Sequence, residues 1–459
     1  MRPKARVVTS RQNRRRVLLL LTCANVSVIS AGQSPPVSVA QPVEFAPLEA
    51  SSDSMVISEQ AGALGSTQGM TLSYLEQLAL QANPSIARLS ALVSAARGNA
   101  VQVGLSPNPE VGFEGQQLGS DGRAEQYGVL LNQELVVREK LRLNRSVAFA
   151  EVRRLEQERE AQRQRVLTDV RIAFARALRA EAQLRVANEL VLIAEQAKAS
   201  ADALLEAAEV SRIDVLQAEI EVENSAILQQ NSENRKAAAL QSLGAVVGQP
   251  LPLNTELQGD LFVSVPGLDF ESTLSQVQQS SPEIASVLAL LERSRANLCR
   301  QIIEPRPNVT VQGLVNWQDN GVDGDSNAGI TVSIPVPIWN RNQGAIHEAR
   351  QQIVAAERQL SQVELELQNR LAPVYERYAN SAEQVRRFES TILPKAEETL
   401  SLTREAYKQG ELSFVNLLTV QRTNANSRIN YLDAVESLRV AEAEIQGLLL
   451  SESLTVRTP

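Results

Sequence analysis

The sequence contains two similar halves, and this internal repeat constrains the fold more than any other feature. The stretch from Asn83-Pro84 to Val111 matches the stretch from Ser281-Pro282 to Val309 at one constant offset and without a gap. A second pair of similar segments lies further along the chain, where residues 209–216 match residues 411–418. Two pairs of similar segments in the same order indicate a duplicated unit of about 200 residues. We therefore expect two copies of one structural unit, one after the other.

Each half predicts the same order of elements: a helix, a two-strand hairpin after a Pro-x-Pro turn, a very long helix and a shorter helix. The pattern places them in the first half at 70–104, 110–115 with 127–135, 143–205 and 213–246. In the second half they fall at 270–302, 307–317 with 328–338, 343–408 and 412–450. Pro373 and Pro394 are expected to bend the second long helix without ending it.

The first long helix carries a coiled-coil seam, because apolar residues recur at heptad spacing. The seam positions are Val170, Ala177, Leu184 and Val191, together with Ala173, Ala180 and Ala187. At 1.5 Å per residue such helices are about 90–100 Å long. The two shorter helices of each half, placed end to end, match that length. Each half is therefore predicted to be a long rod with two short rods in line beside it.

Composition argues against several classes of protein. Only 3% of the residues are aromatic, while Ala, Leu, Glu, Gln and Arg fill long stretches, as in long helices. The net charge of -8 disfavours a nucleic-acid partner. Two cysteines and one histidine leave too few ligands for a zinc or copper centre. With no catalytic constellation either, we predict a protein without a cofactor or resident metal that is not an enzyme.

The first residues have the pattern of a secretory signal. Several arginines precede the apolar run Val17–Leu21, and small residues lead to a plausible cleavage near Ala31. Leu20-Leu21-Thr22-Cys23 faintly matches a lipoprotein signal, so Cys23 is either acylated or a spare cysteine inside a discarded signal. No other apolar run reaches the roughly 20 residues of a membrane helix.

The predicted strands have a length that fits a membrane. A tilted strand of about 9–11 residues crosses a bilayer. Four strands cannot close a barrel, and an open sheet edge is not tolerated in lipid. Oligomerisation is therefore a physical requirement if the two hairpins lie in a membrane.

Several motifs, in their order and doubling, resemble one known family. They are Asn83-Pro84-x-Ile86, Pro107-Asn108-Pro109, Gln133-Glu134-Leu135 leading to Lys140 and Arg145, Ile334-Pro335-Val336-Pro337-Ile338-Trp339-Asn340-Arg341-Asn342-Gln343-Gly344, Ile392-Leu393-Pro394-x-Ala396, Tyr407-x-x-Gly410-Glu411-Leu412-Ser413 and Leu417-Leu418. From about residue 70 to 450 the chain resembles the TolC-like outer-membrane efflux factors. The stretch from Ile334 to Gly344 is similar to the CzcC-like heavy-metal-resistance branch. Two departures, Arg138-Glu139 where the family often has Gly-Gly and Ala208 where the second turn has Gly410, concern local turn geometry.

The resemblance implies a fold class, a location and partners. The fold is expected to be mainly α with a small β part: a duplicated unit of long coiled-coil helices and β-hairpins. Three copies are expected to join an α-helical barrel to a transmembrane β-barrel of about 12 strands. Such a homotrimer lies in outer-membrane lipid and extends into the periplasm. An inner-membrane pump and a periplasmic adaptor deliver small molecules or metal ions into this passive duct.

The expected domain organisation follows from the repeat. Its parts are a signal peptide at 1–31, a flexible or extended lead-in at 32–69, the first efflux-factor repeat at 70–248, a linker at 249–269, the second repeat at 270–452 and a tail at 453–459.

The two breaks between long and shorter helix are candidates for adaptor docking. They comprise Ala208, Glu209, Val210 and Ser211 in the first half, and Gly410, Glu411, Leu412 and Ser413 in the second. Gly410 suits the left-handed conformation that often follows a helix, and Ser211 and Ser413 can cap the next helix. Three copies place six such turns in a ring. The alternative is that they are only tight turns.

Other residues have a functional and a plainer interpretation. Glu206 and Asp214, near the same breaks as Glu209 and Glu411, either form a cation-selective constriction or belong to a solvated face. Phe113, Tyr127, Trp317 and Trp339 either anchor a barrel at the membrane interface or pack in an equatorial core. His347 is interpreted as solvated or packed, Cys299 as a small core residue, and Asp319–Asp325 as an exposed loop, because the glutamate of a calcium loop is missing.

Two other function classes remain as alternatives. A periplasmic coiled-coil adaptor would contain one helical hairpin flanked by small β modules, whereas here a strand pair lies between helices twice. A structural protein of the cell envelope would suit the heptads but leaves the strand pairs unexplained.

Overall fold

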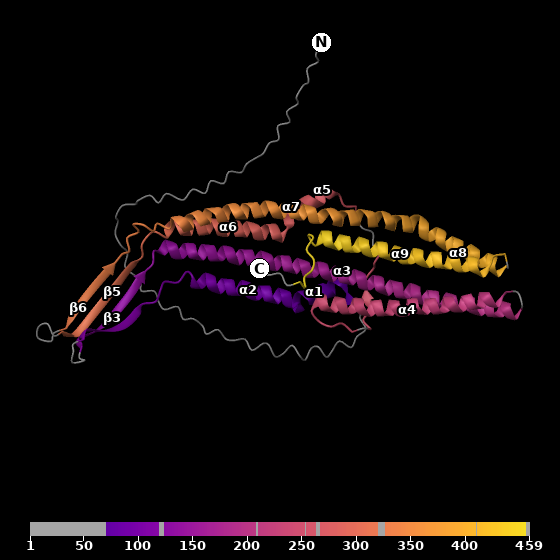
Figure 1. The fold of residues 1–459 in the computed structure, drawn as a ribbon, viewed down its shortest axis with the longest axis horizontal. Helices are drawn as coiled ribbons and strands as arrows, with labels where there is room; N and C mark the ends of the chain where they lie inside the picture. The colour runs from indigo at the N-terminus through magenta and orange to yellow at the C-terminus, as the bar shows by residue number, and fades with distance from the viewer. Residues whose placement is uncertain are drawn as a thin grey trace, which may run out of the picture. The chain divides into compact units, whose positions relative to one another are not determined.

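The computed structural model describes residues 70–118, 124–207, 210–252, 254–262, 267–319, 326–409 and 411–455, which belong to one compact unit, residues 67–459. The predicted signal peptide, the lead-in, Cys23 and the last four residues lie outside the described residues. Long helices run side by side, and a small sheet lies at one end of them (Figure 1).

The described part of the first half contains the short strand β1, a two-strand hairpin and four helices. After the short strand β1 (Met70–Thr71) the elements are α1 (Leu72–Ala82), α2 (Pro84–Gln102), β2 (Glu110–Leu118), β3 (Ala124–Leu135), α3 (Arg138–Glu206) and α4 (Arg212–Val247). The helix α3 has 69 residues. α4 ends at Gly248, whose φ of +94° is the left-handed conformation that glycine adopts without strain.

The second half repeats this order, except that a π-helical turn divides its long helix into α7 and α8. Its elements are β4 (Leu257–Gln258), α5 (Phe270–Ser280), α6 (Pro282–Ile303), β5 (Val309–Asp319), β6 (Asn327–Ser333), α7 (Gln343–Arg387), the π-helical turn η2 (Phe388–Ile392), α8 (Leu393–Lys408) and α9 (Phe414–Gln446). The helical backbone continues past Pro373 and Pro394, as predicted. A π-helical turn precedes Pro394, a residue that cannot donate a helical hydrogen bond.

The prediction of a single helix at 70–104 and at 270–302 was wrong, because each is two helices. Pro84 and Pro282 begin the second helix of each pair, since proline is favoured in the first turn, where its missing N–H is not needed. The Asn83 side chain stabilises the break: its Oδ1 accepts from the Ser85 amide at 2.9 Å and its Nδ2 donates to the Val246 carbonyl at 2.8 Å. The strand predicted at 328–338 ends at Ser333, because Pro335 and Pro337 cannot donate to a sheet.

The helices follow one lateral order at each level. α2 and α4 lie in line along α3, and α6 and α9 contact α3 on its other side (Figure 1). α7 packs on α6, and α8 packs on α9. Near the sheet the order is thus α2, α3, α6, α7, and at the far end it is α4, α3, α9, α8.

Small residues line the predicted seam of α3. Ala173, Ala180, Ala187, Ala194 and Ala201 are all buried at heptad spacing. Beside them, Val166 and Val170 of α3 form a core with Leu75 and Ala79 of α1 and Leu243 of α4. In the second half Leu367 and Leu371 of α7 form the corresponding core with Val277 and Leu438. The heptad prediction is confirmed for the alanines.

The four strands of the two hairpins form one antiparallel sheet in the order β2-β3-β5-β6. β3 and β5 pair across the two halves from Leu135–Val309 to Gln126–Asp319, with a bulge between Tyr127 and Gly128. A Cβ on Gly128 would lie 2.8 Å from the carbonyl oxygen of Val315, so this position requires glycine. β2 and β6 are the two edges.

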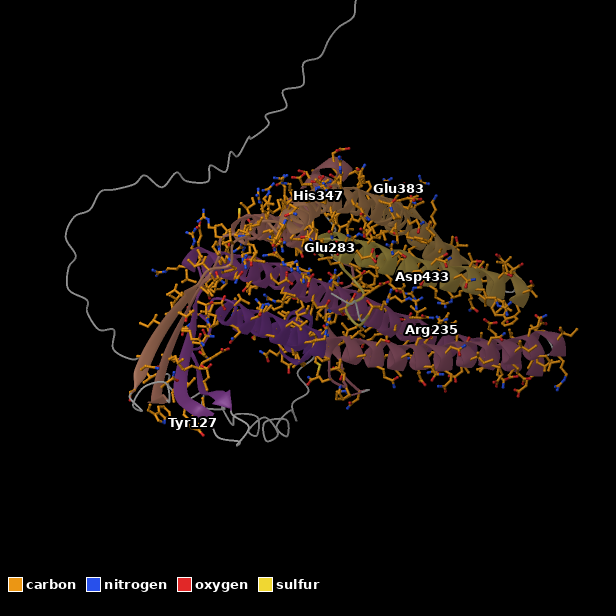
Figure 2. The ribbon with its side chains drawn as sticks, turned by 60° about the vertical axis from the view of Figure 1, so that its left-hand side comes forward. Tyr127, Arg235, Glu283, His347, Glu383 and Asp433 are labelled. Atoms are coloured by element: carbon orange, nitrogen blue, oxygen red, sulfur yellow. The ribbon has the colours of Figure 1, made fainter. Side chains whose placement is uncertain are left out.

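A cluster of ion pairs connects the two halves within the helical part of the molecule. The Glu283 carboxylate pairs with Arg165 of α3 at 2.9 Å and with Arg370 of α7. Its side chain is 19% exposed, and Figure 2 labels it within the helical part. On α7, Glu383 also pairs with two arginines, Arg386 and Arg387, but its side chain is 42% exposed. Both carboxylates thus pair with two arginines, but the Glu283 side chain is less exposed than that of Glu383.

We expect Glu283→Gln to lower the free energy of unfolding by about 2 kcal/mol, because two poorly solvated guanidinium groups each lose one carboxylate partner. Glu383→Gln, the matched control, should leave thermal unfolding in detergent unchanged, because exposed pairs contribute little. Equal melting curves for both variants would show that the Glu283 cluster does not join the halves.

Candidate functional site

The sheet has one apolar and one polar face. The register places Val129 between Phe113 and Val315, and neighbouring positions follow with period two. The apolar face carries Val111, Phe113, Tyr127, Val129, Leu131, Val311, Val315, Trp317, Ala328, Ile330 and Val332, with Gln133 as a polar residue opposite Val311. The polar face carries Glu110, Glu114, Asn132, Gln312, Asn316, Asn327 and Thr331.

The apolar face remains open. The side chains of Val111, Phe113 and Ile330 are 74%, 66% and 82% exposed. A contiguous apolar patch of this kind marks contact with a membrane or a partner. Strands that alternate apolar and polar residues in this way are typical of a sheet with lipid on one side and water on the other.

Three of the four predicted interface aromatics come together on this face. The ring of Phe113 lies 6.0 Å from that of Tyr127 and 6.3 Å from that of Trp317. Tyr127 lies at the part of the sheet far from the helices (Figure 2). Trp339 lies outside this cluster, in the segment between β6 and α7, and is 86% exposed. Phe113, Trp317 and Trp339 are exposed in the single chain, and their role as membrane anchors stays a prediction.

The two helix breaks lie at the same end of the helices, far from the sheet (Figure 1). The structure describes Val210, Ser211, Glu411, Leu412 and Ser413, whereas Ala208, Glu209 and Gly410 lie outside the described residues. Of these, Leu412 is 36% exposed and the two serines are exposed.

One apolar cluster lies behind both turns. Ala201 of α3 and Val215 and Ala218 of α4 pack with Phe414 and Leu418 of α9. Tyr407 of α8 packs on Phe414, with ring centroids 6.0 Å apart. The two turns therefore share one apolar cluster, and together they are called the tip here.

The two predicted serine caps at the tip have different outcomes: Ser211 is the N-cap of α4 in a capping box with Asp214, whereas Ser413 does not cap α9 through its side chain. The Asp214 carboxylate accepts from the amide and the hydroxyl of Ser211, at 3.0 and 2.8 Å, so Asp214 holds the start of α4. Ser413 makes no side-chain cap bond, and its prediction as a cap was wrong. The carbonyl of Ser413, rather than its hydroxyl, accepts from the Asn416 amide at 3.1 Å.

The two predicted constriction residues have different environments. Glu206 is exposed at the end of α3, whereas Asp214 is half-buried and engaged by Ser211. Burial raises the pKa of Tyr407, and the nearby Asp214 carboxylate raises that pKa further. Asp214 therefore faces the tip interior in one chain, and its role in a constriction stays a prediction.

Other expectations concern metals and membranes. His347 is exposed near the start of α7, and among the described residues no group of three or more His, Cys, Asp or Glu is placed to hold a metal ion. Cys299 is also exposed, so its assignment to the core was wrong: its repeat counterpart Val101 is 59% exposed as well. Within the described ranges, no helix has the length and apolar character needed to cross a membrane.

Sequence reasoning missed the two-faced pattern of the last three strands. Leu130 and Leu314 stand opposite each other on the otherwise polar face and obscure the alternation. Leu130 also covers Gly112, where a Cβ would lie 3.2 Å away. The other residues of these strands alternate between apolar and polar with period two, and this alternation was the available sequence signal.

The family model described as "Outer membrane efflux protein" matches residues 75–249 and again residues 273–449. The cobalt-zinc-cadmium resistance protein CzcC of Cupriavidus metallidurans is 24% identical over 381 residues, which cover 83% of this chain and 90% of CzcC.

Solved structures show the same fold. A structure of CusC aligns with a TM-score of 0.66 at 19% identity, over 83% of this chain and 92% of that chain. The outer membrane protein VceC of Vibrio cholerae aligns with a TM-score of 0.66 at 16% identity, over 83% and 96%.

Neighbouring residues on β6 offer a test of the apolar face. We expect Ile330→Lys to reduce recovery of folded protein in the membrane fraction, because a lysine facing lipid costs about 2–4 kcal/mol near the bilayer midplane. Thr331→Lys, on the polar face, should be recovered like the unmodified protein. Equal recovery of both variants would contradict a lipid-facing role.

Proposed function

This chain belongs to the outer membrane efflux protein family, and we propose that three copies of it form the passive outer-membrane duct of a tripartite efflux system. It is accordingly an outer-membrane transport protein with a periplasmic extension, and not an enzyme. The observation that carries the trimeric duct is the four-stranded sheet with two free edges and one open apolar face.

Closure of the sheet requires further copies. In lipid, each unpaired backbone N–H and C=O group costs several kcal/mol, so only closed sheets are stable there. β2 and β6 run antiparallel to each other across the sheet, so β6 of one copy can pair with β2 of the next in the same antiparallel pattern. Three copies supply about 12 strands, an even number as in other outer-membrane barrels.

The helices extend the duct away from the membrane. With 69 residues, α3 is about 100 Å long. Its seam consists of small residues, and its remaining positions carry many charges. Charged side chains of this kind suit contact with water, so three copies would surround a water-filled lumen below the barrel. The two matched repeats, extended to 70–248 and 270–452, are the units of this wall.

The tips are the proposed contact for a periplasmic adaptor, which in turn meets an inner-membrane pump. Each copy contributes two turns that share one apolar cluster, so a trimer presents six turns in a ring. Leu412 is partly exposed there, and Val210 is half-buried. An adaptor with matching apolar tips would bury these side chains.

Divalent metal cations are the proposed cargo. CzcC, which covers most of the chain, is named for resistance to cobalt, zinc and cadmium. A passive duct needs no tight metal site, because a site that held the ion strongly would slow its exit. The pump would then decide which cation enters.

The oligomer can be measured directly. Detergent-corrected light scattering of the solubilised protein should give the mass of three chains, because one chain leaves both sheet edges open. A monodisperse monomer, or recovery of folded protein in the soluble periplasmic fraction, would contradict the trimeric duct.

Docking and cargo can be tested in one growth assay. Deletion of the gene should sensitise the host to cobalt, zinc and cadmium salts, and the unmodified gene should restore growth. The double variant Val210→Asp and Leu412→Asp should remain trimeric in the membrane but fail to restore growth, because two carboxylates per chain would face an apolar partner.

Leu454→Asp, which changes a 53% exposed side chain far from the tip, is the matched control and should restore growth. Full restoration by the tip variant would show that docking occurs elsewhere. Sensitivity to detergents or antibiotics, with unchanged tolerance of metals, would contradict the cargo class alone.

A further inference from the structure

The end of α3 that lies next to the sheet carries arginines on one face. Arg138, Arg142 and Arg145 are spaced by four and then three residues, so they are neighbours on the helix surface. All three are exposed, and the side chain of Arg142 is 76% exposed. Phe149 continues the same face and is 42% exposed, with the Arg145 guanidinium 5.8 Å from the centre of its ring. The three arginines are called the basic stripe here.

The basic stripe has few carboxylate partners. Within the described ranges, no carboxylate forms an ion pair with Arg138 or Arg145, and Arg142 shares Glu139 with Arg306, at 3.8 and 2.8 Å. Like charges four residues apart destabilise a helix, so an anion from outside the chain would stabilise this face. Further along α3, the arginines that do pair with a carboxylate are Arg153, Arg154, Arg163, Arg165, Arg171, Arg176 and Arg179.

The other end of α3 has the opposite charge. The first twelve residues of the helix contain four basic side chains and one carboxylate, Glu139. The last twelve contain Glu195, Asp202 and Glu206 with one basic residue, Lys198. Since the whole chain has a net charge of -8, the excess of positive charge is specific to the end next to the sheet.

The second half has a weaker version of the same face. Counted from the first residue of the helix, the stripe and Phe149 are positions 1, 5, 8 and 12 of α3. The same positions of α7 are exposed as well, and they are Gln343, His347, Arg350 and Val354. Each long helix thus begins with an exposed polar or basic face that ends at an exposed apolar residue.

The strands place the basic stripe at the edge of the lipid-facing part. β3 ends at Leu135, three residues before Arg138, and Leu135 is 54% exposed. At 1.5 Å per residue the stripe extends about 10 Å along α3. The headgroup layer of a bilayer adds roughly 5–8 Å on each side of the hydrocarbon core. With the sheet in lipid, the stripe therefore lies at the depth of the phosphate groups.

The segment between β6 and α7 has the composition of a membrane interface. Ile338 and Trp339 are 58% and 86% exposed there, and Arg341 follows them and is exposed. Tryptophan beside arginine is typical of the headgroup level, where the ring meets both apolar chains and water. This segment leads from the sheet into α7, as the residues before Arg138 lead into α3.

The basic stripe suits the outer side of the proposed duct. α3 lies between α2 and α6 of the same chain, so a copy placed beside this chain does not cover the exposed face of α3. In the lumen, three copies of the stripe would form a ring of arginines around the path of the cations and repel them. On the outer side the same arginines meet the membrane surface.

We propose that the basic stripe, with Arg306 beside it, binds the phosphate groups of anionic phospholipids in the periplasmic leaflet of the outer membrane. The proposal rests on the membrane-embedded duct proposed above and gives it a lipid partner. Guanidinium groups donate paired hydrogen bonds to phosphate oxygens, and they stay charged at any pH of the periplasm. α3 also begins without a side-chain cap among the described residues, so its first N–H groups add positive potential beside Arg138.

Native mass spectrometry of the solubilised protein tests the site, with equal amounts of phosphatidylglycerol and phosphatidylcholine added. The unmodified protein should retain phosphatidylglycerol in preference, because only this lipid has a net negative charge. The triple variant Arg138→Gln, Arg142→Gln and Arg145→Gln should lower the preference by about fivefold for each arginine removed. Arg138→Gln alone removes a side chain without an ion pair in the described chain and should lower the preference by one such factor.

The triple variant Arg185→Gln, Arg212→Gln and Arg358→Gln is the matched control. It removes three exposed arginines that lie further from the sheet, and it should keep the preference. Equal retention of both lipids by the unmodified protein, or equal losses in the two triple variants, would overturn the proposal. Displacement of the lipid by inorganic phosphate would also overturn it, because the site would then take free phosphate.

The same spectra distinguish the lipid site from the trimeric duct. A single-chain mass that retains the preference would contradict the trimer and support the lipid site. A three-chain mass without the preference would support the trimer and overturn the lipid site. Failure of the stripe variant to restore growth on metal salts, with an unchanged lipid preference, would assign the arginines to a protein partner and overturn the proposal.

Discussion

The free backbone edges of β2 and β6 are the constraint on which the rest of the structure depends. An edge strand in water is a liability, and in lipid it is not tolerated, because no solvent replaces the missing hydrogen bonds. The open apolar face of the same sheet argues for lipid on that side. In the proposed trimer, a single chain is therefore only one part of the wall. The lateral order of the helices, with open faces on both outer members, shows the same incompleteness far from the sheet.

Much of this organisation could be predicted from the sequence, because it depends on local pattern. The duplication and the order of elements follow from the repeated segments, and the alanine seam of α3 follows from heptad spacing. The helix breaks at Pro84 and Pro282 were missed, although proline at the first turn is a local signal; the apolar period continued across them. Cys299 was placed in the core because small apolar residues usually are buried, yet its side of α6 is exposed.

Long-range contacts could not be predicted in the same way. The Glu283 cluster joins α6 to α3 and α7, and the tip cluster joins Phe414 to Ala201; neither pairing has a sequence signal without the register of the helices. At the tip Ser211 forms a capping box with Asp214 at the start of α4, whereas Ser413 makes no side-chain cap bond at the start of α9; the residue type is the same in both turns, and only the local geometry decides.

Electron cryo-microscopy of the solubilised protein tests the central claim most directly, since it shows what lies beside each free edge. The account predicts a three-fold particle in which β6 of each copy is hydrogen-bonded to β2 of the next. A particle of any other symmetry, or one in which β2 and β6 remain unpaired, would contradict it.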